Sequence, residues 1–232
     1  PFADLGGPLG LVSPIDLGIK AARAALAKAG LTGAEIGYVV AGSVAQASFD
    51  AYMLPRHIGL YAGAPLEVPA LLVQRVCGTG IEAIIQAASA VERQGAGLAL
   101  AVGAESMSRN PIAAYTHRGG FGLGAPVEFK DFLWEALLDP GCGLTMGGVQ
   151  TGGNSSAVVD GAAAAIIASG TQAKGRAPLA RLVAATAVGC PPEIMGIGPV
   201  PAIRALLART GLTLEDIALV EINEAFGAQV MA

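Results

Sequence analysis

The chain contains 232 residues, of which 53% are hydrophobic and only 14% are charged, and its formal net charge is −4 at pH 7. An acidic chain without a basic cluster is not expected to bind nucleic acid, and no apolar run approaches the roughly 18 residues that a membrane span requires. The charged fraction is well below the roughly 25% of ordinary soluble domains. This deficit indicates a surface covered by another subunit or by further chain, so we expect a homodimer or a homotetramer.

The cysteines and histidines do not follow the spacing of a metal site or of a disulfide framework. Cys77, Cys142 and Cys190 are widely separated, and so are His57 and His117. The first residues lack the basic stretch and apolar core of a signal peptide. We therefore expect reduced thiols in a cytoplasmic protein.

The predicted elements alternate along the chain in the manner of α/β proteins. Residues 14–30 have an amphipathic helical pattern that ends at Gly30, and a second helical pattern begins near residue 79 and ends at Gly95. Short runs rich in apolar residues predict strands at residues 69–76, 97–105 and 162–170. Because strands and helices alternate, the fold class is α/β.

An internal repeat relates the two ends of the chain. A shift of 181 positions (208 − 27 = 181) places residues 208–224 on residues 27–43. The repeat predicts the same helix end, Gly-Leu-Thr turn and strand twice, and therefore two similar halves. Gly30, Leu31, Thr32, Ile36 and Val39 are identical to Gly211, Leu212, Thr213, Ile217 and Val220.

Cys77 stands between the strand predicted at 69–76 and the helix that follows, two residues after Arg75. The ligand crevice of an open α/β sheet lies at the carboxyl ends of its strands, and amide groups at a helix N-terminus favour the nucleophilic thiolate. Gly78 and Gly80 leave room for a substrate to approach. We therefore interpret Cys77 as a nucleophile.

Two other interpretations of these residues stay open. By residue type alone, Cys77 fits a small buried hydrophobic residue. The segment GTGIEA at 78–83 fits the G-x-G-x-x-A fingerprint of dinucleotide-binding proteins, and Glu105 follows at about the distance of a ribose-binding acid. This second interpretation predicts an NAD-dependent oxidoreductase.

Five motifs, in this order, resemble the thiolase family. They are QRVCGTG (74–80), AVGAESMSRNP (101–111), TGGNSSAVVDGAAA (151–164), MGIGPVPA (195–202) and EINEAF (221–226). The segments at 44–60 and 129–139 are most similar to the acetyl-CoA acyltransferase, or 3-ketoacyl-CoA thiolase, branch. The resemblance implies a five-layered αβαβα fold with two pseudo-symmetric halves, here residues 1–147 and 148–232.

The resemblance also implies an acyltransferase whose substrates are coenzyme A thioesters and which needs no metal or other cofactor. In the family, Cys77 would take up the acyl group as a thioester, and Asn223 would hold a water that helps to form an oxyanion hole. Six residues fall on positions that line the pantetheine and acyl tunnel, namely Met146, Gly152, Ser156, Met195, Ala225 and Phe226.

The chain departs from the family pattern in three places. The opening strand of the family is absent before Pro1, and the sequence passes through residues 144–154 without the long loop domain that binds much of coenzyme A. A Gly-His-Pro histidine and a second reactive cysteine are expected only after Ala232. A non-catalytic acyl-CoA-binding or scaffold protein is therefore the alternative to the acyltransferase, with the oxidoreductase third.

Overall fold

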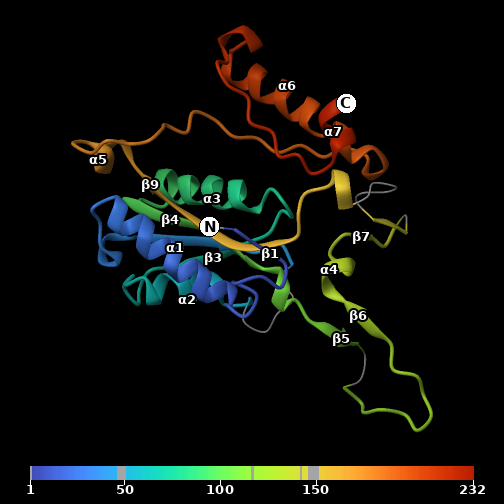
Figure 1. Ribbon diagram of the computed structural model, residues 1–232. Helices are drawn as coiled ribbons and strands as arrows, with labels where there is room; N and C mark the ends of the chain where they lie inside the picture. Colours follow the sequence, from blue (N-terminus) through green and yellow to red (C-terminus); the bar gives the residue numbers. More distant parts are fainter. Residues whose placement is uncertain (1, 46–50, 116–117, 142, 146–151) are drawn as a thin grey trace. The chain divides into compact units, whose positions relative to one another are not determined.

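The computed structural model describes residues 2–45, 51–115, 118–141, 143–145 and 152–232 (Figure 1). The chain forms two compact units. Unit 1 contains residues 1–136 and 158–176, and unit 2 contains residues 137–157 and 177–232. This grouping differs from the halves expected on either side of residue 147, because a strand that begins at residue 159 joins the sheet of unit 1. The division into thiolase halves at residue 147 stays a prediction.

A five-stranded mixed sheet forms the core of unit 1. Its strands are β1 (Ala3–Asp4), β2 (Tyr38–Gly42), β3 (Ala70–Val73), β4 (Leu98–Ser106) and β9 (Val159–Ala168), in the order β1-β9-β4-β2-β3. β2 pairs parallel with both β3 and β4, whereas β9 pairs antiparallel with β4 and β1. β3 and β4 lie on either side of β2 and run parallel to it, so the chain needs a crossover connection between them, and the helix that joins them packs over β2 and β4.

Helices cover both faces of this sheet (Figure 1). They are α1 (Pro14–Lys28) and α2 (Leu54–Tyr61) on one face and α3 (Thr79–Arg93) on the other. Successive residues of a strand point to opposite faces. Leu100 and Val102 of β4 therefore pack in the cluster with α1 and α2, whereas Ala99 and Ala101 pack with α3. The two small residues let α3 approach the sheet closely.

The elements of unit 1 confirm the sequence predictions. The helix expected at 14–30 is α1, in which the Ser13 side chain accepts a hydrogen bond from the backbone N–H of Asp16 (3.0 Å), and Gly30 follows the helix with a φ of 64°. The three expected strands are β3, β4 and β9. The remaining elements are the hairpin β5 (Ile112–Ala114) and β6 (Phe129–Asp131), then α4 (Phe132–Glu135) and α5 (Gly170–Ala173).

The internal repeat reappears in unit 2 as a helix end and a turn. Gly211 follows its helix in the left-handed conformation, with a φ of 71°. The N–H of Thr32 donates to the Glu35 carboxylate (2.7 Å), and the N–H of Thr213 donates to the Asp216 carboxylate (2.9 Å). The elements of unit 2 are β7 (Leu138–Asp139), β8 (Leu144–Thr145), α6 (Pro199–Thr210) and α7 (Gly227–Met231).

The repeat also predicts a second strand, and this prediction is wrong. Residues 219–223 match β2 in the repeat, but they form no strand. β2 has a paired neighbour on each side, whereas β7 and β8, the strands among the described residues of unit 2, pair only with each other. An extended segment is not stable as a strand without a neighbour that satisfies its backbone N–H and C=O groups.

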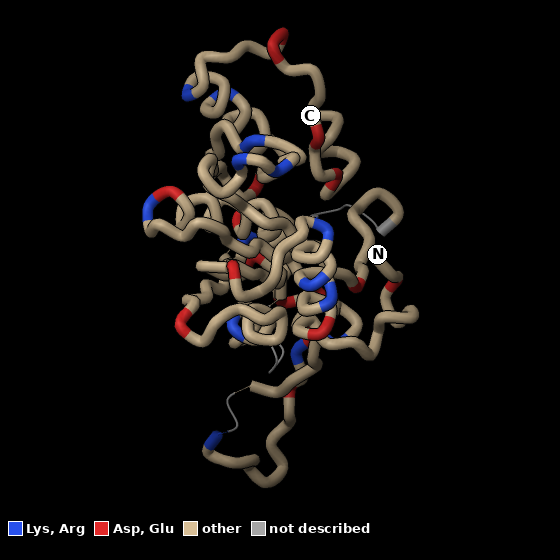
Figure 2. Tube along the Cα trace, turned by 90° about the vertical axis from the view of Figure 1, so that its left-hand side faces the viewer, with Lys and Arg blue, Asp and Glu red and all other residues tan. Residues whose placement is uncertain are grey.

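Charged side chains are sparse and mixed in sign over the described chain. Figure 2 shows Lys and Arg interspersed with Asp and Glu, separated by long stretches with neither. Among the described residues, no helix is long and apolar enough to cross a membrane. No group of three or more His, Cys, Asp or Glu side chains in this part of the chain is placed to hold a metal ion.

Candidate active site

Cys77 lies in the turn between β3 and α3 and is exposed. Its interpretation as a buried hydrophobic residue is therefore wrong. Because β2, β3 and β4 run parallel, their carboxyl ends meet at the edge of the sheet where this turn lies. Gly78 is the N-cap residue of α3, and a Cβ placed on Gly80 would meet no atom within 4 Å. A Cβ on Gly78 would instead lie 3.2 Å from the Arg75 carbonyl oxygen, so the room that the sequence predicts for a substrate is found at Gly80 and not at Gly78.

The residue before the thiol has a strained backbone. Val76 has a φ of 43°, and it is the one non-glycine residue with a positive φ in the described chain. This left-handed region is unfavourable for a β-branched residue. A conformation of this kind costs on the order of 1–3 kcal/mol and persists only where the surrounding structure enforces it, most often at functional sites. The strain at Val76 therefore marks the Cys77 turn as a candidate active site.

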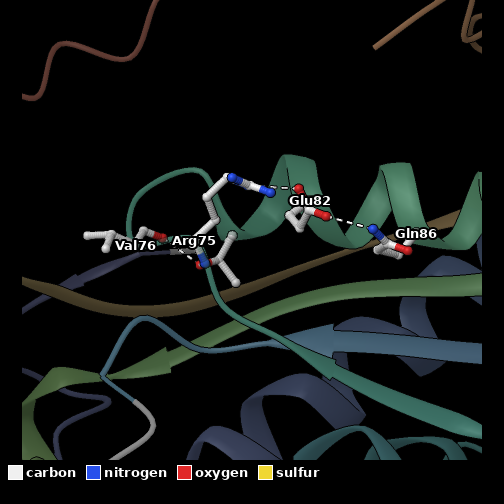
Figure 3. A network of polar contacts seen from close by, with 5 residues as sticks. Arg75, Val76, Glu82 and Gln86 are labelled. Carbon is white, nitrogen blue, oxygen red and sulfur yellow. Dashed lines mark hydrogen bonds and ion pairs between the residues drawn. The ribbon is translucent and has the colours of Figure 1, made fainter. Parts of the chain in front are cut away.

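A polar network ties this turn to the first turns of α3 (Figure 3). The Arg75 Nε donates to the Glu82 carboxylate at 2.8 Å, and the Gln86 side chain donates to the other carboxylate oxygen at 2.7 Å. The hydrogen bond from Gln86, followed by that from Arg75, lowers the pKa of Glu82 below its ordinary value although partial burial opposes the shift. Glu82 is therefore a carboxylate at neutral pH, and it holds a cationic residue two positions from Cys77.

Glu105 lies at the same edge and on the same face of the sheet as this turn. It is two residues beyond Gly103, whose Cβ position lies 3.8 Å from the Gly80 Cα. The Glu105 carboxylate accepts hydrogen bonds from the Ser43 hydroxyl (3.0 Å) and from the backbone N–H of Val44. Burial raises the pKa of Glu105 despite these bonds, and the charge of Asp160 adds to the effect. Glu105 thus supports the segment after β2 and is not the free acid that a dinucleotide ribose would need.

In unit 2, two loops that carry predicted site residues pair with each other. The backbone N–H of Ser156 donates to the Ala225 carbonyl and its hydroxyl donates to the Glu224 carbonyl, both at 3.0 Å. Ser155 and Phe226 form an antiparallel bridge. Gly152 lies in the helical turn Gly152–Asn154 that leads into this pairing. Ser156, Ala225 and Phe226 are thus neighbours, and their place in an acyl tunnel stays a prediction.

Asn223 begins the second of these loops and is exposed. Its carbonyl accepts a hydrogen bond from the backbone N–H of Ala225 (3.0 Å), and the same N–H also donates to the Gln229 side chain (3.1 Å). These bonds form a tight turn that fixes the backbone of Asn223. Because Asn223 is exposed, its side-chain amide does not need the protein hydrogen-bond partners that a buried amide requires.

Met195 lies in a third segment of unit 2, the helical turn Pro192–Ile197, and is half-buried. Its carbonyl accepts a hydrogen bond from the Gly198 N–H (3.0 Å). This segment packs against α7, with the Cβ position of Gly196 3.4 Å from the Gln229 Cβ. Met146 lies outside the described residues, and so does Cys142.

Comparisons with known proteins identify the family. The family model described as "Thiolase, N-terminal domain" matches residues 1–149, and that described as "Thiolase, C-terminal domain" matches residues 176–232. The chain belongs to the thiolase family. A mitochondrial 3-ketoacyl-CoA thiolase of Bos taurus is 32% identical to this thiolase over 314 aligned positions, which cover 100% of this chain and 79% of the relative.

Solved thiolase structures are similar over the whole chain. Human mitochondrial 3-ketoacyl-CoA thiolase in complex with CoA superimposes with a TM-score of 0.94 at 33% identity and covers 100% of this chain and 78% of that chain. The Bacillus anthracis acetyl-CoA acetyltransferase gives a TM-score of 0.92 at 28% identity, with coverage of 100% and 79%. The expected α/β thiolase fold is thus confirmed, and this thiolase is an acyltransferase by family.

The comparisons leave two predictions as they were. The bovine alignment is 82 positions longer than this chain (314 − 232 = 82), so the relative contains positions that have no counterpart here. The place of the missing positions does not follow from this difference, so a missing loop domain stays a prediction. The bovine relative is mitochondrial by its printed name, and a cytoplasmic location for this thiolase likewise stays a prediction.

Sequence reasoning missed the side chains that hold the candidate site in place. Thr79, Glu82 and Gln229 all bond to the backbone or side chains of the Cys77 and Asn223 segments. In the sequence, Thr79 and Glu82 belong to the GTGIEA segment at 78–83 and to the start of a helical pattern, and neither feature predicts these bonds. A polar residue in the first turn of a helix is the available signal, since such side chains commonly bond to nearby backbone groups.

Proposed function

We propose that this thiolase transfers acyl groups between coenzyme A thioesters through a thioester formed on Cys77. In the degradative direction it would cleave a 3-ketoacyl-CoA, and in the reverse direction it would condense two acetyl-CoA molecules. Family membership supports acyl transfer, while the similarity to both a 3-ketoacyl-CoA thiolase and an acetyl-CoA acetyltransferase leaves the preferred direction and chain length as matters for experiment.

The observation that carries the proposal is the setting of Cys77. An exposed thiol follows a strained residue at the carboxyl edge of three parallel strands and precedes the N-terminus of α3. Amide groups at a helix N-terminus stabilise a nearby anion, and the thiolate is the form of cysteine that attacks carbonyl carbons. The exposed position lets a substrate as large as a coenzyme A thioester reach the sulfur.

In the proposed thiolysis, the Cys77 thiolate attacks the C3 carbonyl carbon of the 3-ketoacyl-CoA and forms a carbon–sulfur bond. The bond between C2 and C3 then breaks, and C2 takes its electron pair and a proton from a general acid, so that acetyl-CoA leaves. The thiolate of a second coenzyme A attacks the acyl-Cys77 thioester, releases the shortened acyl-CoA and restores the Cys77 thiolate.

Both attacks place negative charge on a carbonyl oxygen. We propose that Asn223 supports one donor of the oxyanion hole. We also propose that the pantetheine and acyl tunnel is lined by Gly152, Ser156, Met195, Ala225, Phe226 and Met146. The pairing of the Ser156 and Ala225 loops supports this assignment because it holds several of these residues together. Coenzyme A binding is supported by the CoA complex of the human structure. A homodimer or homotetramer, the cytoplasmic location and the absence of a cofactor remain part of the proposal.

Acetyl-CoA and intact-protein mass spectrometry test the nucleophile. The chain should gain the mass of one acetyl group, and added coenzyme A should remove it. The Cys77→Ser variant should not acquire an acetyl group that added coenzyme A can remove. Cys190→Ser is the matched control, because Cys190 is a half-buried thiol in unit 2, and it should behave like the wild type.

Two results would overturn the proposal. Acetylation that persists in Cys77→Ser would place the acyl group on another residue. Binding of acetyl-CoA without any gain in mass would instead favour the non-catalytic acyl-CoA-binding alternative. Reactivity can be checked independently with iodoacetamide, which should modify Cys77 before Cys190.

A further inference from the structure

The side chain of Thr79 bonds to the backbone at two points just before Cys77, the Arg75 N–H and the Val76 carbonyl. Its hydroxyl accepts a hydrogen bond from the Arg75 N–H (2.9 Å) and donates one to the Val76 carbonyl. The backbone N–H of Thr79 donates to the same carbonyl at 3.0 Å. A threonine hydroxyl has a single proton to donate. Here that proton is used on the strained residue.

These bonds determine the orientation of the peptide plane that leads into Cys77. The Val76 carbonyl and the Cys77 N–H belong to one planar peptide unit. Two donors from Thr79 hold the carbonyl oxygen of this unit and thereby fix its plane. The direction in which the Cys77 side chain leaves the backbone depends on this plane, so the sulfur is oriented by the clamp that Thr79 forms.

The hydrogen bonds from Thr79 oppose relaxation of the strained backbone at Val76. A valine with a φ of 43° would relax to a negative φ if nothing held it. Relaxation would rotate the following peptide unit and move the Cys77 sulfur. The bonds from Thr79 act directly on the Val76 carbonyl and therefore oppose this rotation.

The clamp itself is held in place by packing. Thr79 is only 4% exposed. A Cβ on Gly42 would lie 2.2 Å from the Thr79 Cγ2, so the methyl group occupies the space that the glycine at the end of β2 leaves open. A side chain locked by packing in this way keeps its hydroxyl in one orientation.

We propose that Thr79 is a positioning residue for acyl transfer, which sets the direction of the Cys77 sulfur through its two bonds to the Arg75–Val76 backbone. The proposal rests on the proposed function of Cys77. It predicts that the hydroxyl, and not the volume of the side chain, determines how fast Cys77 is acylated. A displacement of the reacting atom by about 1 Å is enough to slow a reaction by about a hundredfold.

Two substitutions separate the hydroxyl from the volume. Thr79→Val keeps the shape that fills the space over Gly42 but removes the hydroxyl, whereas Thr79→Ser keeps the hydroxyl but removes the methyl group. We expect Thr79→Val to slow acetylation of Cys77 by about ten- to a hundredfold, with an unchanged Kd for acetyl-CoA. Thr79→Ser should retain the rate within about threefold, because both hydrogen bonds remain possible.

The readouts are the single-turnover rate of acetyl transfer from acetyl-CoA, the Kd for acetyl-CoA, the thermal unfolding midpoint and a crystal structure of each variant. In Thr79→Val the φ of Val76 should become negative, and in Thr79→Ser it should remain positive. If Thr79→Val does not fold, Thr79→Ala removes the hydroxyl with less volume and serves in its place.

Failure of this inference and failure of the proposed function give different results. If the wild type is not acetylated on Cys77, the proposed function fails, and the φ of Val76 in the variant structures still decides whether Thr79 holds the turn. If the wild type is acetylated and Thr79→Val matches its rate, the positioning role is overturned. Equal losses of rate in Thr79→Val and Thr79→Ser would also overturn it, because they would show that packing rather than the hydroxyl matters.

Discussion

Replacement of Gly42 by alanine tests the close contact between β2 and the Cys77 turn. The new Cβ would lie 2.5 Å from the Val73 carbonyl oxygen and 2.2 Å from the Thr79 Cγ2. To reach an ordinary contact of 3.4 Å, the oxygen would have to move by 0.9 Å (3.4 − 2.5 = 0.9) and the methyl group by 1.2 Å (3.4 − 2.2 = 1.2). Neither group moves easily, because Val73 belongs to the β2–β3 ladder and Thr79 is buried.

Overpacking of this kind costs about 1–3 kcal/mol, and displacement of Thr79 weakens hydrogen bonds worth about 1 kcal/mol each. We therefore expect Gly42→Ala to lower the free energy of unfolding by about 2–4 kcal/mol. Urea denaturation followed by circular dichroism measures the change, which at a typical urea m-value of about 2 kcal/mol/M lowers the midpoint by about 1–2 M.

Gly80→Ala is the matched control, because a Cβ at this helical position meets no atom within 4 Å. It should leave the free energy of unfolding unchanged or raise it by up to about 1 kcal/mol, since alanine favours a helix more than glycine does. If Gly42→Ala lowered the free energy of unfolding by less than about 0.5 kcal/mol, β3 would be able to move aside without cost. The reasoning from close contact would then be refuted.

Three further predictions concern the core, pH dependence and catalysis. Leu100→Ala in the fully buried centre of β4 should lower the free energy of unfolding by about 2–5 kcal/mol, whereas Leu66→Ala, at a 74% exposed site, should change it by less than about 0.5 kcal/mol in the same urea titration. The pKa of Glu105 is higher in the folded state than its ordinary value of 4.5, so the folded state binds the proton more tightly than the unfolded state does. The free energy of unfolding therefore falls as pH rises above 4.5. The stability of Glu105→Gln relative to wild type should therefore increase with pH in thermal melts above that value, and a constant difference would contradict the assignment. Asn223→Ala should slow acetyl transfer by about a hundredfold or more with little change in the Kd for acetyl-CoA, because an oxyanion-hole partner acts mainly in the transition state; an unchanged single-turnover rate would remove Asn223 from the site.

The sequence was sufficient where short-range patterns decide the structure. The apolar spacing of α1 and α3, the glycines that end them and the apolar runs of β3 and β4 predict a β-α-β unit with Cys77 at its turn. These features depend on neighbours a few residues away, so the residues themselves carry the information. The order of the motifs likewise identifies the thiolase family without a structure.

Only the tertiary structure decided which elements find partners and which side chains support the site. Residues 219–223 repeat the pattern of β2 but form no strand, because strand pairing needs neighbours from distant parts of the chain. The hydrogen bond between Glu105 and Ser43 spans 62 positions, and the contact of Thr79 with Gly42 joins α3 to β2. The left-handed φ of Val76 is contrary to its residue type, and the Thr79 side chain that bonds to the Val76 carbonyl is itself packed against Gly42 of the distant strand β2.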